Sequence, residues 1–106
     1  MTNLVTDINA TVRNMRSTME QAQAALNKLH ALSAELDIVV DELAAKRDRY
    51  ETDLTVTVED FEEADAQLNA ALDNLRNIEI EQRIFQDYID GTQHILWRYE
   101  TLWGLE

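Results

Sequence analysis

The feature that most constrains this chain is the spacing of its apolar residues, which alternates between three and four along nearly the whole length. Residues at this spacing lie on one face of an α-helix. A heptad repeat of this kind is typical of helices that pack along a continuous seam. The pattern runs through residues 5–54 and again through residues 61–103, so the sequence predicts two long amphipathic helices.

The apolar positions of the repeat form the predicted seam of a helical hairpin. Its residues are Val12, Met19, Leu26, Leu29, Leu36, Val40, Leu43, Phe61, Leu68, Leu75, Ile78, Phe85, Ile89 and Leu96. The exceptions to the apolar pattern are Ser33, Arg47, Gln82 and Thr92. Most of each predicted helix therefore carries a stripe that has to be covered by another helix.

Composition supports an all-α fold. The 106 residues include no Pro and only two Gly, whereas turn-rich and β-rich folds need many turn residues. The period-two pattern of a strand occurs only in the four residues TVTV, Thr55–Val58. The chain is expected to form a single helical domain over residues 1–106.

Residues 52–57 decide between a hairpin and one continuous helix. β-branched residues cluster there, and they are mediocre helix formers when consecutive. Thr57 and Asp60 have the spacing of a helix N-cap, which predicts a second helix from Val58. The sequence thus favours helices over about residues 5–51 and 58–103, with a turn at 52–57. The alternative, a coiled-coil helix of about 100 residues and about 150 Å, stays open because the heptad register continues through the turn.

Pairing across a hairpin also favours the turn. If the chain folds back near Asp53, residue i meets a residue near 107−i, and large side chains repeatedly meet small ones, as Phe85 meets Ala22. Arg47 would lie near Phe61 and is predicted to stack on its ring. A parallel pair of continuous helices would instead place Arg47 against Arg47 in the seam.

Apolar residues extend beyond the seam and predict a second contact face. The predicted assembly face consists of Leu72, Ile80, Ile84, Tyr88 and Ile95. A stripe this broad suits a bundle of several helices, so we expect the hairpin to associate into a homo-oligomer or a larger assembly.

Aromatic residues are concentrated near the C-terminus. Trp97, Tyr99 and Trp103 are the predicted partner-docking residues, because Trp and Tyr are enriched at protein-contact hot spots. The same residues could instead cap the open end of the hairpin. Asp90-Gly91 is a candidate kink or end of the second helix, at residues 90–92, which would leave the tail as a separate short helix.

The charge is strongly acidic and uneven. The net charge is −12, and residues 35–65 alone carry twelve acidic and three basic groups. Direct nucleic-acid binding is not expected, because phosphate contacts need clustered Lys and Arg. Abundant Asp and Glu with only two Lys is a composition of salt-adapted proteins and also of many acidic helical proteins from mesophiles.

Motifs for catalysis or cofactor binding are not found in the sequence. It has no Cys, no glycine-rich phosphate loop and no Glu-x-x-His pair, and its two serines lie in periodic helix. Asp90 and His94 have i, i+4 spacing for a metal ion but lack an evident third ligand. We therefore expect no enzymatic activity, cofactor, metal or small-molecule substrate.

These features favour a structural or assembly subunit that binds protein, for example a connector, neck or tail part of a virus particle. The alternative is an acidic inhibitor that mimics nucleic acid, with Glu35, Asp41, Glu42 and Asp48 on an outer arc of the first helix. A regulatory hairpin that masks a partner's helix would use the same surface as an assembly subunit. No secretory signal or membrane-spanning run is evident, which predicts a cytoplasmic protein or a component of a soluble particle.

Overall fold

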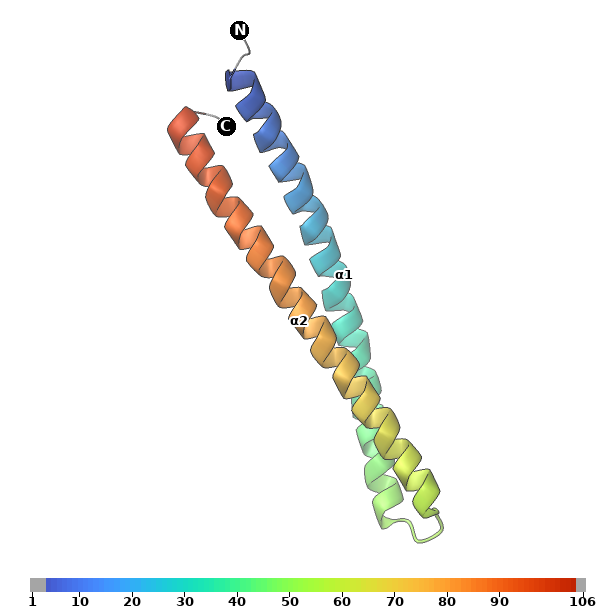
Figure 1. The fold of residues 1–106 in the computed structure, drawn as a ribbon. Helices are drawn as coiled ribbons and strands as arrows, with labels where there is room; N and C mark the ends of the chain where they lie inside the picture. Colours follow the sequence, from blue (N-terminus) through green and yellow to red (C-terminus); the bar gives the residue numbers. More distant parts are fainter. Residues whose placement is uncertain (1–3, 105–106) are drawn as a thin grey trace. The chain divides into compact units, whose positions relative to one another are not determined.

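A computed structural model describes residues 4–104, which form a helical hairpin (Figure 1). Helix α1 comprises Leu4–Thr52 and helix α2 comprises Val58–Trp103, and the described residues contain no strand. The predicted hairpin is confirmed, and the alternative of one continuous helix is wrong. Residues 53–57 leave the helical conformation and reverse the chain.

The reversal is held by short-range hydrogen bonds of Asp53. Its carboxylate accepts hydrogen bonds from the backbone N–H of Thr55 at 2.9 Å and from the Thr55 hydroxyl at 2.6 Å. The backbone N–H of Val56 donates to the Asp53 carbonyl at 3.3 Å. Asp and Thr favour turns because their side chains bond backbone groups two residues away, in competition with helix formation.

Helix α2 begins with the N-cap that the sequence indicates. The Thr57 hydroxyl accepts a hydrogen bond from the backbone N–H of Asp60 at 3.1 Å, and the Phe61 N–H donates to the Thr57 carbonyl at the same distance. The capped N–H would otherwise have no intrahelical partner. Glu59 and Asp60 occupy the first turn, where the helix dipole favours negative charge.

Helix α2 continues through Gly91 to Trp103, so the aromatic tail is its last part and not a separate short helix. A single glycine inside a helix costs about 1 kcal/mol relative to alanine, which neighbouring seam contacts can offset. Ile89 and Thr92, on either side of Gly91, are both buried. Gly104 follows the helix with φ of +64°, the left-handed conformation typical of a residue just after a helix end.

The hairpin consists of two compact units. The turn unit comprises residues 29–81, and the terminal unit combines residues 1–28 with 82–106. In the turn unit the buried side chains belong to Ala64, Leu68 and Ala71.

In the terminal unit, Ala22, Leu26 and Ile89 form a buried cluster against which Met19 and Phe85 pack. Phe85 and Ala22 thus belong to the same cluster and line the same groove, as folding back near Asp53 predicts. The small side chain makes room for the large one, as close packing requires.

Seam residues alternate with solvent-exposed residues along both helices. The buried members are Val12, Leu26, Leu68, Ile89 and Leu96. The half-buried members are Met19, Leu29, Leu36, Val40, Leu43, Phe61, Leu75, Ile78 and Phe85. Each helix therefore turns its heptad stripe away from solvent, and burial of these apolar side chains holds the hairpin together.

Candidate interaction surface

Apolar side chains remain exposed on α2 after the seam is buried. In the terminal unit Ile84 is 61 % exposed, Ile95 44 % and Tyr88 42 %. In the turn unit Ile80 and Leu72 are also exposed. Exposed apolar residues at regular helical spacing are typical of a surface that another helix covers.

The heptad register separates these five residues into different faces. Ile84, Tyr88 and Ile95 each stand one position before a seam residue. Leu72 stands one position after a seam residue. Ile80 stands two positions after the seam residue Ile78, between the positions that precede and those that follow the seam. Ile84, Tyr88 and Ile95 share a side of the terminal unit, and Leu72 and Ile80 belong to the turn unit; that all five form one assembly face stays a prediction.

A groove between the helices contains two of these residues. Its lining in the terminal unit is Thr18, Gln21, Ala22, Ile84, Phe85 and Tyr88. The residues before the seam on α1 and on α2 thus lie on the same side of the terminal unit. Further along α2, Ile95 lines a second hollow with Arg98, Tyr99 and Leu102.

We call this side the groove face and define it as the terminal-unit residues one position before each seam position. On α1 these are Asp7, Thr11, Asn14, Thr18, Gln21, Ala25 and Lys28; on α2 they are Ile84, Tyr88, Gly91, Ile95, Arg98 and Leu102. Only one of the thirteen is acidic, although 21 of the chain's 106 residues are. The groove face is therefore the acid-poor side of an acidic protein.

The opposite side of the terminal unit is charged and polar. There Arg16 of α1 forms an ion pair with Glu100 of α2. The side-chain amide of Gln86 donates to the Asp90 carboxylate at 2.9 Å, one turn along the helix. Trp97 is the large apolar residue on this side, and its ring stacks on that of His94 with centroids 6.1 Å apart.

The three predicted docking residues occupy different positions around α2. Trp97 is exposed on the charged side, whereas Tyr99 is half-buried at a seam position and lines the hollow beside Ile95. Trp103 is exposed at the last residue of α2, also at a seam position. Of the three, only Tyr99 adjoins the groove face. Their closeness along the chain predicts one docking site, but residues at these spacings point in different directions around α2.

The turn unit has its own groove, with a more acidic lining. It is lined by Leu32, Glu35, Leu36, Val39, Asn74, Asn77 and Ile78. A neighbouring hollow includes Glu42, Lys46 and Arg49. Leu32 and Val39 are exposed, but the carboxylates of Glu35 and Glu42 alternate with them along α1. This surface is less apolar than the groove face.

Carboxylates of the acidic block have different neighbours along α1. Glu35 and Glu42 line the hollows just described, whereas Asp48 lies 3.8 Å from the Arg47 guanidinium. Arg47, predicted to stack on Phe61, forms an ion pair with Asp65 instead.

Groups of three or more His, Asp or Glu side chains that could hold a metal ion are not found among residues 4–104. Asp90 accepts its hydrogen bond from Gln86, and His94 stacks on Trp97. Neither helix, within the part of the chain that the structure describes, has a segment apolar enough to cross a membrane.

Comparisons of the chain with models of known protein families, with curated proteins and with solved structures found no match.

Proposed function

We propose that this protein is a non-enzymatic assembly module that binds another helical protein through the groove face of its terminal unit. The observation that carries the proposal is the row of Ile84, Tyr88 and Ile95, apolar and exposed on the acid-poor side. Covering such a row with a further helix would remove apolar surface from water, at about 25 cal/mol per Å². The hairpin would then be one part of a larger helical bundle.

The heptad repeat supports a structural role. A repeat kept over most of both helices is the pattern of helices that pack along a continuous seam, which suits a connector or spacer within a complex. The row at Ile84, Tyr88 and Ile95 adds a second stripe that the hairpin itself does not cover. An assembly module needs both features, one stripe for its own fold and another for its partner.

The experiment compares the complex formed by the wild-type chain with that of two variants. Ile84→Asp places a charge in the groove face, and Gln93→Asp places the same residue on the charged side of α2, in an exposed position. Both variants should keep the helical circular dichroism of the wild type. The proposal expects Ile84→Asp, but not Gln93→Asp, to reduce the mass of the complex. The mass is measured by light scattering on purified protein and in extracts at native concentration.

A wild-type chain that forms no complex under any of these conditions would overturn the proposal. So would a complex that Ile84→Asp and Gln93→Asp weaken equally, because the groove face would then have no special part in it. The measurement is made at low and at molar salt, since association driven by apolar burial persists at high salt.

An acidic inhibitor remains the second candidate, favoured by the exposed Glu35, Asp41, Glu42 and Asp48 in the turn unit. Its binding to a basic protein would be strongest at low salt and lost at molar salt. Ile84→Asp would leave that binding unchanged, since the variant lies in the other unit and adds a carboxylate. The same pair of variants thus distinguishes the two functions.

A further inference from the structure

We infer that two copies of this chain exchange their second helices at high protein concentration, so that α1 of each copy packs against α2 of the other. The exchange opens both turns at residues 53–57 and joins α1 to α2 as one helix within the pair. A single chain stays a hairpin, and the exchanged pair is a second state. This state uses the seam and not the groove face, so the inference goes beyond the proposed function and does not depend on it.

The seam register is unbroken across the turn. Its positions there are Tyr50, Leu54, Thr57 and Phe61, at steps of four, three and four. A helix built through residues 53–57 would therefore carry the stripes of α1 and α2 on the same side. An opened chain thus presents one continuous apolar stripe, which the same stripe of a second copy can cover.

Antiparallel pairing of two opened chains re-forms the contacts of the hairpin. Folding back near residue 53 pairs seam residues whose numbers add up to 107 or 108, as Ala22 with Phe85 and Met19 with Ile89. These four residues belong to one cluster in the hairpin. The same pairs recur between copies in an antiparallel arrangement, with one residue from each chain. Exchange of identical elements is a low-cost route to a dimer, because both states bury the same side chains.

Leu54 is the residue that distinguishes the two states. It stands at a seam position, yet its side chain is 101 % exposed at the turn of the hairpin. It is also the seam residue that the total of 108 pairs with its own copy, so the two-fold axis of the exchanged pair passes beside it. Exchange therefore removes from water a large apolar side chain that the hairpin leaves there.

The turn contains nothing that prevents a helix. Residues 53–57 include no Gly or Pro and no residue with positive φ. Their side chains are exposed apart from that of Val56, which is half-buried. The bonds of Asp53 to Thr55 and of Thr57 to Asp60 span at most three residues, and a helix replaces them with its own backbone bonds. The β-branched residues keep the turn preferred in the single chain.

Charge at the turn opposes the exchange and makes it salt-dependent. Residues 50–63 carry six acidic groups and no basic group. These segments of the two copies would lie side by side at the centre of the exchanged pair, where their carboxylates repel each other. Salt screens this repulsion. The fraction of exchanged pairs should therefore rise between low and molar salt, the opposite of association through ion pairs.

The decisive experiment is a disulfide that reports which chain supplies each half of the seam. Ser33→Cys and Leu75→Cys are combined in one chain, which has no native cysteine. Both sites are half-buried seam positions of the turn unit, and their numbers add up to 108. The reduced protein is refolded at high concentration in molar salt, and the two-chain fraction is isolated by size exclusion and oxidised.

The inference expects this fraction to run in denaturant at twice the 12.2 kDa chain mass, because each disulfide joins different chains. The one-chain fraction, oxidised in the same way, is the control and should stay at the single-chain mass without free thiol. A two-chain fraction that falls to the single-chain mass would consist of closed hairpins and would overturn the inference. So would the absence of a two-chain species after refolding.

A pair of variants at the turn provides an independent check. Leu54→Asp places two like charges at the two-fold axis and should weaken the exchanged pair by about tenfold or more. Val58→Asp is the matched control, because Val58 is also exposed near the turn, at 72 %, but stands one position after the seam. Both variants should keep the circular dichroism of the hairpin at low concentration. Equal weakening by the two would indicate contact between closed turns and overturn the inference.

Ile84→Asp separates this inference from the proposed function. Ile84 lies outside the seam, so the variant should leave the exchanged pair intact while it weakens a complex made through the groove face. A two-chain species that is lost in Ile84→Asp and kept in Leu54→Asp would overturn the exchange and support the groove face as the contact.

Discussion

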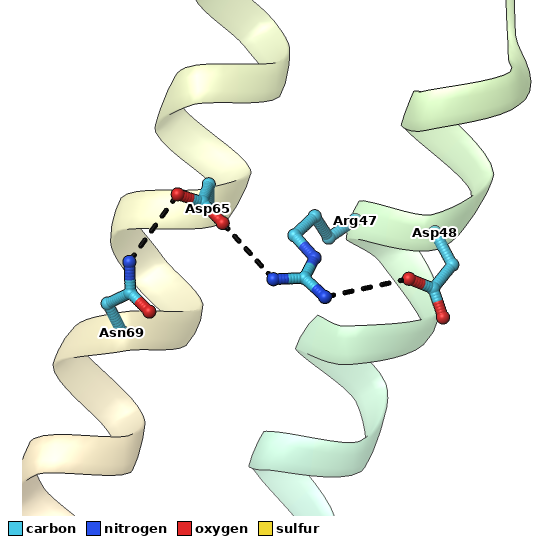
Figure 2. Close-up of polar contacts among 4 residues, drawn as sticks. All are labelled: Arg47, Asp48, Asp65 and Asn69. Carbon is cyan, nitrogen blue, oxygen red and sulfur yellow. Dashed lines mark hydrogen bonds and ion pairs between the residues drawn. The ribbon is translucent and has the colours of Figure 1, made fainter.

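The guanidinium of Arg47 lies 3.2 Å from the carboxylate of Asp65, so an ion pair joins α1 to α2 at a seam position (Figure 2). Figure 2 also shows the second carboxylate oxygen of Asp65 accepting a hydrogen bond from Asn69, at 3.4 Å. The hairpin therefore accommodates a charge in its seam by directing it to the flank of the facing helix. In a parallel pair of continuous helices the same residue would face its own copy.

Replacing Arg47 by Met should change the free energy of unfolding by less than about 1 kcal/mol. The ion pair is partly exposed, with 36 % and 41 % of the two side chains accessible, so water screens it. Met restores the apolar pattern and offsets the loss. Urea unfolding of Arg47→Met and of Asp65→Asn measures both halves of the pair. A loss above about 2 kcal/mol in either variant would show that the ion pair is a major source of stability.

Leu26→Ala should lower the free energy of unfolding by about 2–5 kcal/mol. Leu26 is only 2 % exposed and lies in the cluster with Ala22 and Ile89, so its truncation leaves a cavity between the helices. Leu32→Ala, at an exposed site of the same helix, is the matched control and should cost less than about 1 kcal/mol. Equal losses in chemical denaturation would mean that the terminal-unit cluster is not the core described here.

Thr57→Ala should lower the free energy of unfolding by about 1 kcal/mol, because it removes the acceptor for the Asp60 N–H. Thr57→Ser keeps the hydroxyl and should retain most of the stability. Thermal melts followed by circular dichroism compare the three proteins. If the serine variant were as unstable as the alanine variant, the lost methyl group and not the cap would explain the effect.

The pH dependence of stability should include a contribution from Asp53. Hydrogen bonds from the Thr55 hydroxyl and backbone N–H lower the pKa of Asp53 below its ordinary value of 3.8. A carboxyl whose pKa is lower in the folded state stabilises the fold above the unfolded pKa. That contribution is lost as the pH falls through the folded value.

Asp53→Ala should therefore be less stable than the wild type at pH 6, and the difference should shrink below pH about 3.8. Unfolding curves of both proteins between pH 6 and pH 2 give this comparison. Thr55→Val, which removes the side-chain donor, should reproduce part of the loss. A difference that stays constant across this pH range would assign it to the turn backbone and not to the charge of Asp53.

Sequence by itself determined the helices and their ends. The spacing of apolar residues fixes which side of each helix is buried, because the angle between successive residues in an α-helix is constant. The cap at Thr57 is equally local, since all its atoms lie within three residues of one another. Helix ends and seam could for this reason be predicted without knowledge of the tertiary structure.

Tertiary structure decided what lies beside the seam. The heptad register passes through residues 53–57 unchanged, so the repeat alone did not distinguish a hairpin from a continuous helix. The hydrogen bonds of Asp53 and the packing of Phe85 against the cluster around Leu26 do distinguish them. The partner of Arg47 was likewise not predictable, because the flank of α2 that approaches it depends on how the two helices pack. For the same reason the sequence did not show that Ile84 and Tyr88 share a groove with Thr18 and Gln21 of α1.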